Sequence, residues 1–119
     1  MPDHSNVARG RWGEALADRH LRRVGHRIVD RNWRSPERGV RGELDIVSFV
    51  GDVVVFVEVK ARRRHGFGGA AAAVDDRKQQ QIRSLAESWL RLHGDAVERV
   101  RFDVIAIEGV HLTHLEAAF

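Results

Sequence analysis

The chain has no cysteine, and only two of its 20 basic residues are lysine. Without cysteine it can form neither disulfides nor thiolate zinc sites, and a reducing compartment fits this composition. No apolar run approaches the ~20 residues that a membrane-spanning helix requires. The first residues, Met1-Pro2-Asp3-His4-Ser5, lack the charged and apolar regions of a secretory signal. These absences predict a soluble cytoplasmic protein with no membrane partner.

The length and the charge limit what the chain can be. Its 119 residues, 43% of them hydrophobic, predict a single domain spanning 1–119 with one modest core. The formal net charge is +3, but residues 1–64 carry 14 basic and 9 acidic side chains, and the remainder carries 6 and 8. An excess of positive charge in the first half favours a polyanionic partner such as nucleic acid. Charge alone does not separate this interpretation from ordinary solubility.

The most informative stretch is residues 45–60, which predicts two strands joined by a tight turn at Gly51-Asp52. With that turn, the strand pairing places Asp45 directly opposite Glu58, and opposed residues have Cβ atoms about 4.5–5.5 Å apart. Lys60 follows Glu58 by two positions and therefore points to the same face. Opposed carboxylates destabilise a sheet unless a cation lies between them. Two carboxylates, a cation and a lysine together suit metal-assisted cleavage of phosphodiesters.

Periodicity and turn signals predict the remaining elements. Helices are expected over about 6–24 and 75–93, and strands over 26–33, 43–50, 53–61, 100–107 and 110–115. The first three strands can pair antiparallel, and the second helix can return the chain so that the fourth strand lies parallel to the third. The prediction is an α/β fold with a mixed sheet, in the order helix, strand, strand, strand, helix, strand, and with helices on both faces.

Face assignments follow from the same periodicities. On the first helix, the apolar positions Ala8, Trp12, Ala15 and Leu16, together with Arg19, form the predicted buried stripe. Glu14 lies off that stripe, nearer the line of Ala17 and Leu21, and the pattern alone favours a solvated glutamate. One face of the hairpin is predicted to carry Leu44, Ile46, Val50, Val53, Val55, Val57 and Val59. Trp12, Trp33 and Trp89 are expected in the core rather than as platforms for base stacking.

The aspartate followed after twelve residues by Glu-Val-Lys, together with the element order, resembles the PD-(D/E)xK nucleases. These have the restriction-endonuclease-like three-layer core and include the archaeal Holliday-junction resolvases. A closer likeness is to the YraN-like family of bacterial proteins, described as endonuclease-like. The matching segments are Gly13-Glu14-Ala15, Arg31-Asn32-Trp33-Arg34, Gly42-Glu43-Leu44-Asp45-Ile46-Val47, Val55-Phe56-Val57-Glu58-Val59-Lys60-Ala61-Arg62, Arg101-Phe102-Asp103-Val104 and Ala118-Phe119. Leu44 replaces the proline that commonly precedes the aspartate.

The resemblance implies roles for particular residues. Asp45 and Glu58 would hold a divalent metal, with the Val59 carbonyl as a further ligand, and Glu14 would help to complete the site. Lys60 would orient or activate the attacking water. Because hard oxygen ligands select Mg²⁺ or Mn²⁺, one of these two ions is the expected cofactor.

Two groups of basic residues are candidates for binding nucleic acid. Lys78, at the start of the second helix, would approach phosphate by the same resemblance. Arg62, Arg63 and Arg64 precede a glycine-rich segment and predict either a clamp on the phosphate backbone or an ordinary solvated loop. Lys60 and Lys78 are also the only lysines, which suggests positions where a compact ammonium is required.

Simpler interpretations remain open. Glu43 lies opposite Lys60 in the predicted register, so the hairpin could carry only ordinary salt bridges. A structural role is expected for Asp103, and His111 and His114 are expected to face opposite sides of a strand, which makes them a poor metal pair. The predicted function is a metal-dependent nuclease acting on branched or otherwise unusual DNA as a homodimer. The alternatives are a non-catalytic nucleic-acid-binding domain with the same fold, and an adaptor whose basic surface meets an acidic protein.

Overall fold

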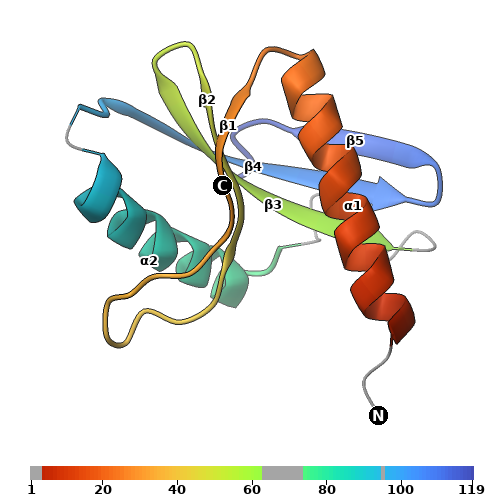
Figure 1. Cartoon of the computed structure of the whole chain (residues 1–119), viewed down its shortest axis with the longest axis horizontal. Coiled ribbons are helices and arrows are strands. Elements are labelled where there is room, and N and C mark those ends of the chain that lie inside the picture. Colours follow the sequence, from red (N-terminus) through yellow and green to blue (C-terminus); the bar gives the residue numbers. More distant parts are fainter. Residues whose placement is uncertain (1–3, 63–73, 95) are drawn as a thin grey trace.

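The computed structural model describes residues 4–62, 74–94 and 96–119 of the chain. In these residues the elements follow in the order α1 (His4–Arg23), β1 (Arg27–Trp33), β2 (Leu44–Val50), β3 (Val53–Arg62), α2 (Asp76–His93), β4 (Arg99–Glu108) and β5 (His111–Leu115) (Figure 1). The predicted order is confirmed, and each boundary differs from its prediction by no more than two residues.

The strands form one mixed sheet in the order β1-β2-β3-β4-β5. β1, β2 and β3 pair antiparallel, β3 and β4 pair parallel, and β5 returns antiparallel to β4. Helix α1 covers one face of the sheet, and α2 covers the other (Figure 1). The three layers agree with the expected restriction-endonuclease-like core. In the described part of the chain, no helix is long and apolar enough to cross a membrane.

Helix α1 faces the sheet through its smallest side chains. Ala17 and Leu21 are fully buried, and a Cβ added at Gly13 would lie only 2.7 Å from the Cβ of Ala61 on β3. The predicted stripe is therefore wrong, because the helix is turned so that small residues allow a close approach to β3. Trp12 is 48% exposed. Ala8 lies outside the residues whose side chains the structure describes.

Helix α2 is capped at both ends and buries one stripe of side chains. The Asp75 side chain accepts a hydrogen bond from the Lys78 backbone N–H at the first turn, and Gly94 ends the helix. Buried Leu85 and Trp89 pack in the same cluster as Phe56 of β3. Leu44 also belongs to this cluster, although it was predicted to share a face with Ile46, which packs with Ala17 and Leu21 of α1. The strict alternation fails there because the pairing of β2 with β3 ends at Ile46–Val57, before Leu44 is reached.

Candidate metal centre

The β2–β3 hairpin brings Asp45 and Glu58 together at the open end of the sheet. The predicted register is confirmed from Val50–Val53 to Ile46–Val57, and Asp45 and Glu58 are the next residues of the two strands. Asp45 Oδ2 accepts a 2.9 Å hydrogen bond from the Val59 backbone N–H. Glu58 is only 6% exposed. Burial, followed by the adjacent Glu58 carboxyl, raises the pKa of Asp45 to about 8.

Two further glutamates converge on Asp45 from other elements. Glu14 comes from α1, Glu43 directly precedes β2, and one carboxylate oxygen from each lies within 4.8 Å of the others and of Asp45. Burial is the main cause that raises the pKa of Glu14, and the negative charges of Asp45 and Glu43 add to it. Glu14 can reach this position because Gly13 lets α1 lie against β3. Gly13, which allows α1 to approach β3, and Glu14, which joins the acidic cluster, are therefore adjacent in the sequence.

Asn32 links the two glutamates, a role that the sequence analysis missed. Its side-chain Nδ2 donates to both oxygens of Glu14 at 3.1 and 3.0 Å and to Glu43 Oε1 at 2.9 Å. The backbone of Asn32 is left-handed, with φ 51°, a conformation that asparagine tolerates better than most residues. The only signal was its place in the segment 31–34 that matched the family. Arg34 reinforces the arrangement through a 3.0 Å ion pair with Glu43.

The two lysines occupy different positions around the cluster. Lys78 Nζ lies 3.5 Å from Glu58 Oε2, a buried atom that accepts no hydrogen bond among the described residues. Lys60 lies on the same face of β3 as Glu58 and makes no ion pair within residues 4–62, 74–94 and 96–119. Glu43 pairs with Arg34 rather than with Lys60. The salt bridge proposed as the simpler interpretation of Lys60 is therefore not formed.

The residues present fit a hard divalent cation. The cluster offers only oxygen ligands, from Glu14, Glu43 and Asp45, and the neighbouring Glu58 has a buried oxygen with no hydrogen bond in the described structure. Carboxylate oxygens are the ligands that Mg²⁺ and Mn²⁺ prefer. Glu43, Asp45 and Glu58 also line one narrow crevice together with Ile82 of α2. The carboxylates predicted as metal ligands are thus gathered in one place. Glu43, which the sequence offered only as a possible partner of Lys60, belongs to the same cluster.

The other candidate residues lie apart from this cluster. Arg62 is the last residue of β3, and its carbonyl accepts a hydrogen bond from the Gly109 N–H, so it belongs to the strand. Arg63 and Arg64 lie outside the described residues. Asp103 is fully buried. Burial alone would raise its pKa, but hydrogen bonds from His114 and Arg101 outweigh that cost and hold the pKa of Asp103 at about 2. These contacts agree with the structural role expected for Asp103.

The fold and the cluster together define an α/β protein with a restriction-endonuclease-like core and a carboxylate centre at one end of strands β2 and β3. The model of the family described as Uncharacterised protein family UPF0102 matches residues 13–107, and the chain belongs to this family. A UPF0102 protein of Rhodococcus jostii is 49% identical over 119 residues, covering 96% of this chain and 98% of the relative. One from Frankia casuarinae is 46% identical, with coverage of 94% and 96%. A Pseudomonas savastanoi relative is also 46% identical, with coverage of 92% and 86%.

Proposed function

We propose that this chain is a metal-dependent nuclease that hydrolyses phosphodiester bonds in nucleic acid, with branched or otherwise structured DNA as its substrate. One observation carries the proposal: four carboxylates from α1, β2, β3 and the loop before β2 meet at one end of the sheet. Such a concentration of negative charge in a partly buried site is costly without a cation. The basic first half of the chain supplies the attraction for a polyanion.

Asp45 and Glu58 would hold Mg²⁺ or Mn²⁺ with the Val59 carbonyl, and Glu14 and Glu43 would complete the oxygen set. When bound, the cation would lower the pKa of water and neutralise charge on the phosphoryl oxygens. The protein's own contribution is orientation. The Val59 N–H fixes one oxygen of Asp45, and Asn32 fixes Glu14 and Glu43.

Lys60 and Lys78 would have different roles in the reaction. Lys60 has no ion-pair partner in the described part of the chain, so its ammonium is available to orient the attacking water and to stabilise charge that develops on the phosphate. Lys78 neutralises Glu58 in the metal-free protein. With a cation beside Glu58, Lys78 would be free to turn toward a flanking phosphate, because its side chain is 34% exposed.

A second candidate function rests on the same lysine. Because Lys78 gives Glu58 a protein partner, the site has partial charge compensation without any metal. That observation favours a non-catalytic nucleic-acid-binding domain that keeps the fold.

Cleavage assays separate the two functions. Linear, nicked, flapped and four-way DNA and a structured RNA would be incubated with Mg²⁺, with Mn²⁺ or with EDTA. We expect divalent-dependent cleavage that is strongest on the branched substrates and is lost in Asp45→Asn. The matched control is Asp52→Asn, which removes the same charge from the exposed hairpin turn, where the Asp52 side chain is 74% exposed. Salt-sensitive binding without cleavage of any substrate would favour the binding domain instead.

The proposed nuclease acts as a homodimer. The described residues gather one carboxylate cluster of this kind, and one such site cuts one strand at a time. Two copies related by a two-fold axis would present a site to each strand of a branched junction. Sedimentation with and without four-way DNA tests this point. A complex with one protein copy per junction would contradict it.

A further inference from the structure

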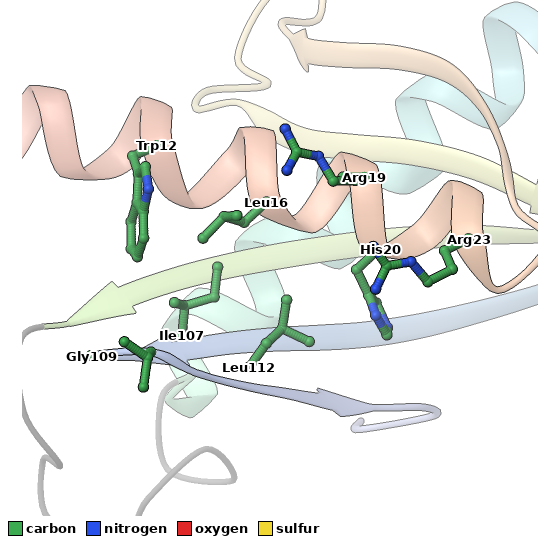
Figure 2. A pocket seen from close by; sticks show the side chains of 9 residues that line it. Trp12, Leu16, Arg19, His20, Arg23, Ile107, Gly109 and Leu112 are labelled. Atoms are coloured by element: carbon green, nitrogen blue, oxygen red, sulfur yellow. The ribbon is translucent and has the colours of Figure 1, made fainter.

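A second site lies on the other flank of α1, facing β4 and β5. It is a half-open cavity of about 480 Å³ between the helix and the turn that joins these strands (Figure 2). Its lining is Trp12, Leu16, Arg19, His20, Arg23, Ile107, Gly109, Val110 and Leu112. The floor is apolar, the exposed Trp12 ring forms one wall, and the lining contains no acidic residue. We call this cavity the Trp12 pocket.

The positive charge in the Trp12 pocket is uncompensated. Arg19 and Arg23 form no ion pair with any residue that the structure describes, whereas Arg22 and Arg31 both pair with Asp18. His20 and Arg23 lie side by side at one end of the pocket (Figure 2). An anionic group is therefore the natural complement of this end of the cavity.

The orientation of His20 is fixed from the protein interior. His114 Nε2 lies 2.7 Å from Asp103 Oδ2, and His114 Nδ1 lies 3.0 Å from His20 Nε2. Because the Asp103 carboxylate can only accept, His114 donates through Nε2, and its Nδ1 shares a hydrogen bond with His20 Nε2. This leaves His20 Nδ1 as the ring nitrogen with no hydrogen bond among the described residues. A hydrogen-bonding group held in this way is a feature of a binding site rather than of a solvated helix face.

We infer that the Trp12 pocket binds an unpaired segment of the substrate, with one base stacked on Trp12 and neighbouring phosphates against Arg19 and Arg23. The choice of nucleic acid rests on the proposed function, and the chemistry of the pocket matches it. Single-stranded nucleic acid is bound by exposed aromatic rings beside cations that follow the backbone. A second copy of the chain is a poor occupant, because two-fold pairing of this pocket would bring Arg19 and Arg23 against identical groups without an acidic residue in the lining.

The Trp12 pocket and the carboxylate cluster lie on opposite sides of α1. Trp12 and Glu14 are two residues apart on α1, so their side chains leave the helix about 200° apart. Glu14 faces Asn32 of β1, and Trp12 faces β4 and β5. The carboxylate cluster and the pocket are thus separated by one helix width of about 10–12 Å, which is a few nucleotides of strand. The enzyme would recognise DNA that carries a single-stranded segment beside the scissile phosphate.

Binding without cleavage tests the inference directly. A fluorescein-labelled single-stranded 12-mer and the matching duplex would be titrated by fluorescence anisotropy in EDTA. Trp12→Ala and Trp12→Leu should each weaken single-strand binding about 5- to 150-fold, the range for losing one stacked base, and leave duplex binding unchanged. The fold should survive both changes because Trp12 is half exposed, and circular dichroism would check this. Equal affinity of wild type and both variants for the single strand would overturn the inference.

The arginines provide an independent measurement. Arg19→Gln with Arg23→Gln should lower the slope of log K against log salt for the single strand by up to about 1.4, at about 0.7 for each lost contact. The matched control is Arg27→Gln with Arg99→Gln, which removes the same charge at the hairpin end of the sheet. An equal loss in the control pair would show that net charge alone is responsible.

Tryptophan fluorescence identifies the stacking residue, because bases quench a ring on which they stack. Single-stranded DNA should quench the wild type and a Trp33→Phe variant but not Trp12→Phe. If the protein self-associates in the absence of DNA, as measured by sedimentation, and this association quenches the fluorescence of Trp12, the pocket binds a second copy and the inference is overturned. Binding that depends on Trp12 in a protein that cleaves nothing would refute the proposed nuclease alone. Cleavage without such binding would refute the pocket alone.

Discussion

Replacing Asp45 by asparagine should stabilise the metal-free protein at alkaline pH. Burial and the Glu58 carboxyl raise the pKa of Asp45 from its ordinary 3.8 to about 8. The folded state therefore holds a proton on Asp45 that the unfolded chain releases near pH 4. This contribution to stability is fully present below pH 4 and is lost as the pH rises through 8. In Asp45→Asn no proton has to be released, and the variant should be the more stable protein at pH 9.

The size of the effect follows from the shift. About four pKa units, at about 1.4 kcal/mol each, set a ceiling on the order of 5 kcal/mol. The Lys78 ammonium lies near this pair of carboxylates and offsets part of the cost, so we expect somewhat less than half of this ceiling, or about 2 kcal/mol. For a chain of this length, that corresponds to a Tm difference of about 8 °C. The asparagine introduced by Asp45→Asn would still accept from the Val59 N–H through its oxygen and could donate to Glu58 through its amide.

Thermal unfolding between pH 5 and pH 9 in EDTA measures this difference. The quantity of interest is Tm of Asp45→Asn minus Tm of the wild type, because the other titrating groups contribute to both proteins. It should be smallest at pH 5, rise up to about pH 8 and level off above it. Asp52→Asn, on the exposed turn, should show no such rise. A constant difference across this range would refute the assignment of a buried, protonated Asp45.

Three further predictions concern the site, the helix and the basic segment. Lys60→Ala should lower cleavage by roughly 10²-fold in rate assays, with nucleic-acid affinity nearly unchanged, and Lys60→Arg should rescue poorly; full activity would reduce Lys60 to a surface charge. Gly13→Ala should destabilise the protein by about 1–3 kcal/mol and weaken Mn²⁺ binding, because the new Cβ would meet β3 at 2.7 Å. The control Gly10→Ala meets nothing within 4 Å on the same helix and should stabilise it by about 1 kcal/mol in the same melts. Changing Arg62, Arg63 and Arg64 to glutamine should lower the salt slope of duplex binding by up to about 0.9 for each lost contact, and an unchanged slope would place the duplex elsewhere.

Local signals made the hairpin predictable. Gly51 has the positive φ of 57° that a two-residue turn requires. The strand that follows is rich in valine, and the register set by this turn buries its side chains on both faces of the sheet. Once the turn is placed, counting back along each strand brings Asp45 and Glu58 together. The juxtaposition of these two carboxylates could therefore be predicted from the sequence alone.

The orientation of α1 could not be predicted in the same way. Its apolar pattern indicates that the bulky Trp12 and Leu16 are buried, but the sheet selects the helix face that allows the closest approach. That face carries Gly13 and Ala17, and Leu21 completes it. The choice depends on Ala61, a residue 48 positions away in the sequence from Gly13, and helical periodicity contains no information about such a partner.

Asn32 shows the same limit at the site itself. Its amide contacts Glu14 and Glu43 because β1 packs against α1 and pairs with the start of β2. Nothing in the segment 31–34 indicates which side chain points toward the acids. The exposure of Trp12 follows from the same rotation of α1, so the Trp12 pocket could be found only in the folded chain.

Without a cation, three separate groups compensate the negative charge of the carboxylate cluster: a proton on Asp45, the amide of Asn32 and the ammonium of Lys78. A cation that binds there must displace at least the proton, because a ligating carboxylate is ionised. Metal affinity should therefore rise about tenfold per pH unit up to pH 8 and level off above it. Calorimetric titration with Mn²⁺ at pH 6, 7 and 8 in buffers of different ionisation enthalpy measures both the affinity and the released proton. Asp45→Asn should lose the pH dependence together with most of the affinity. Tight binding that does not vary with pH in the wild type would place the cation away from Asp45.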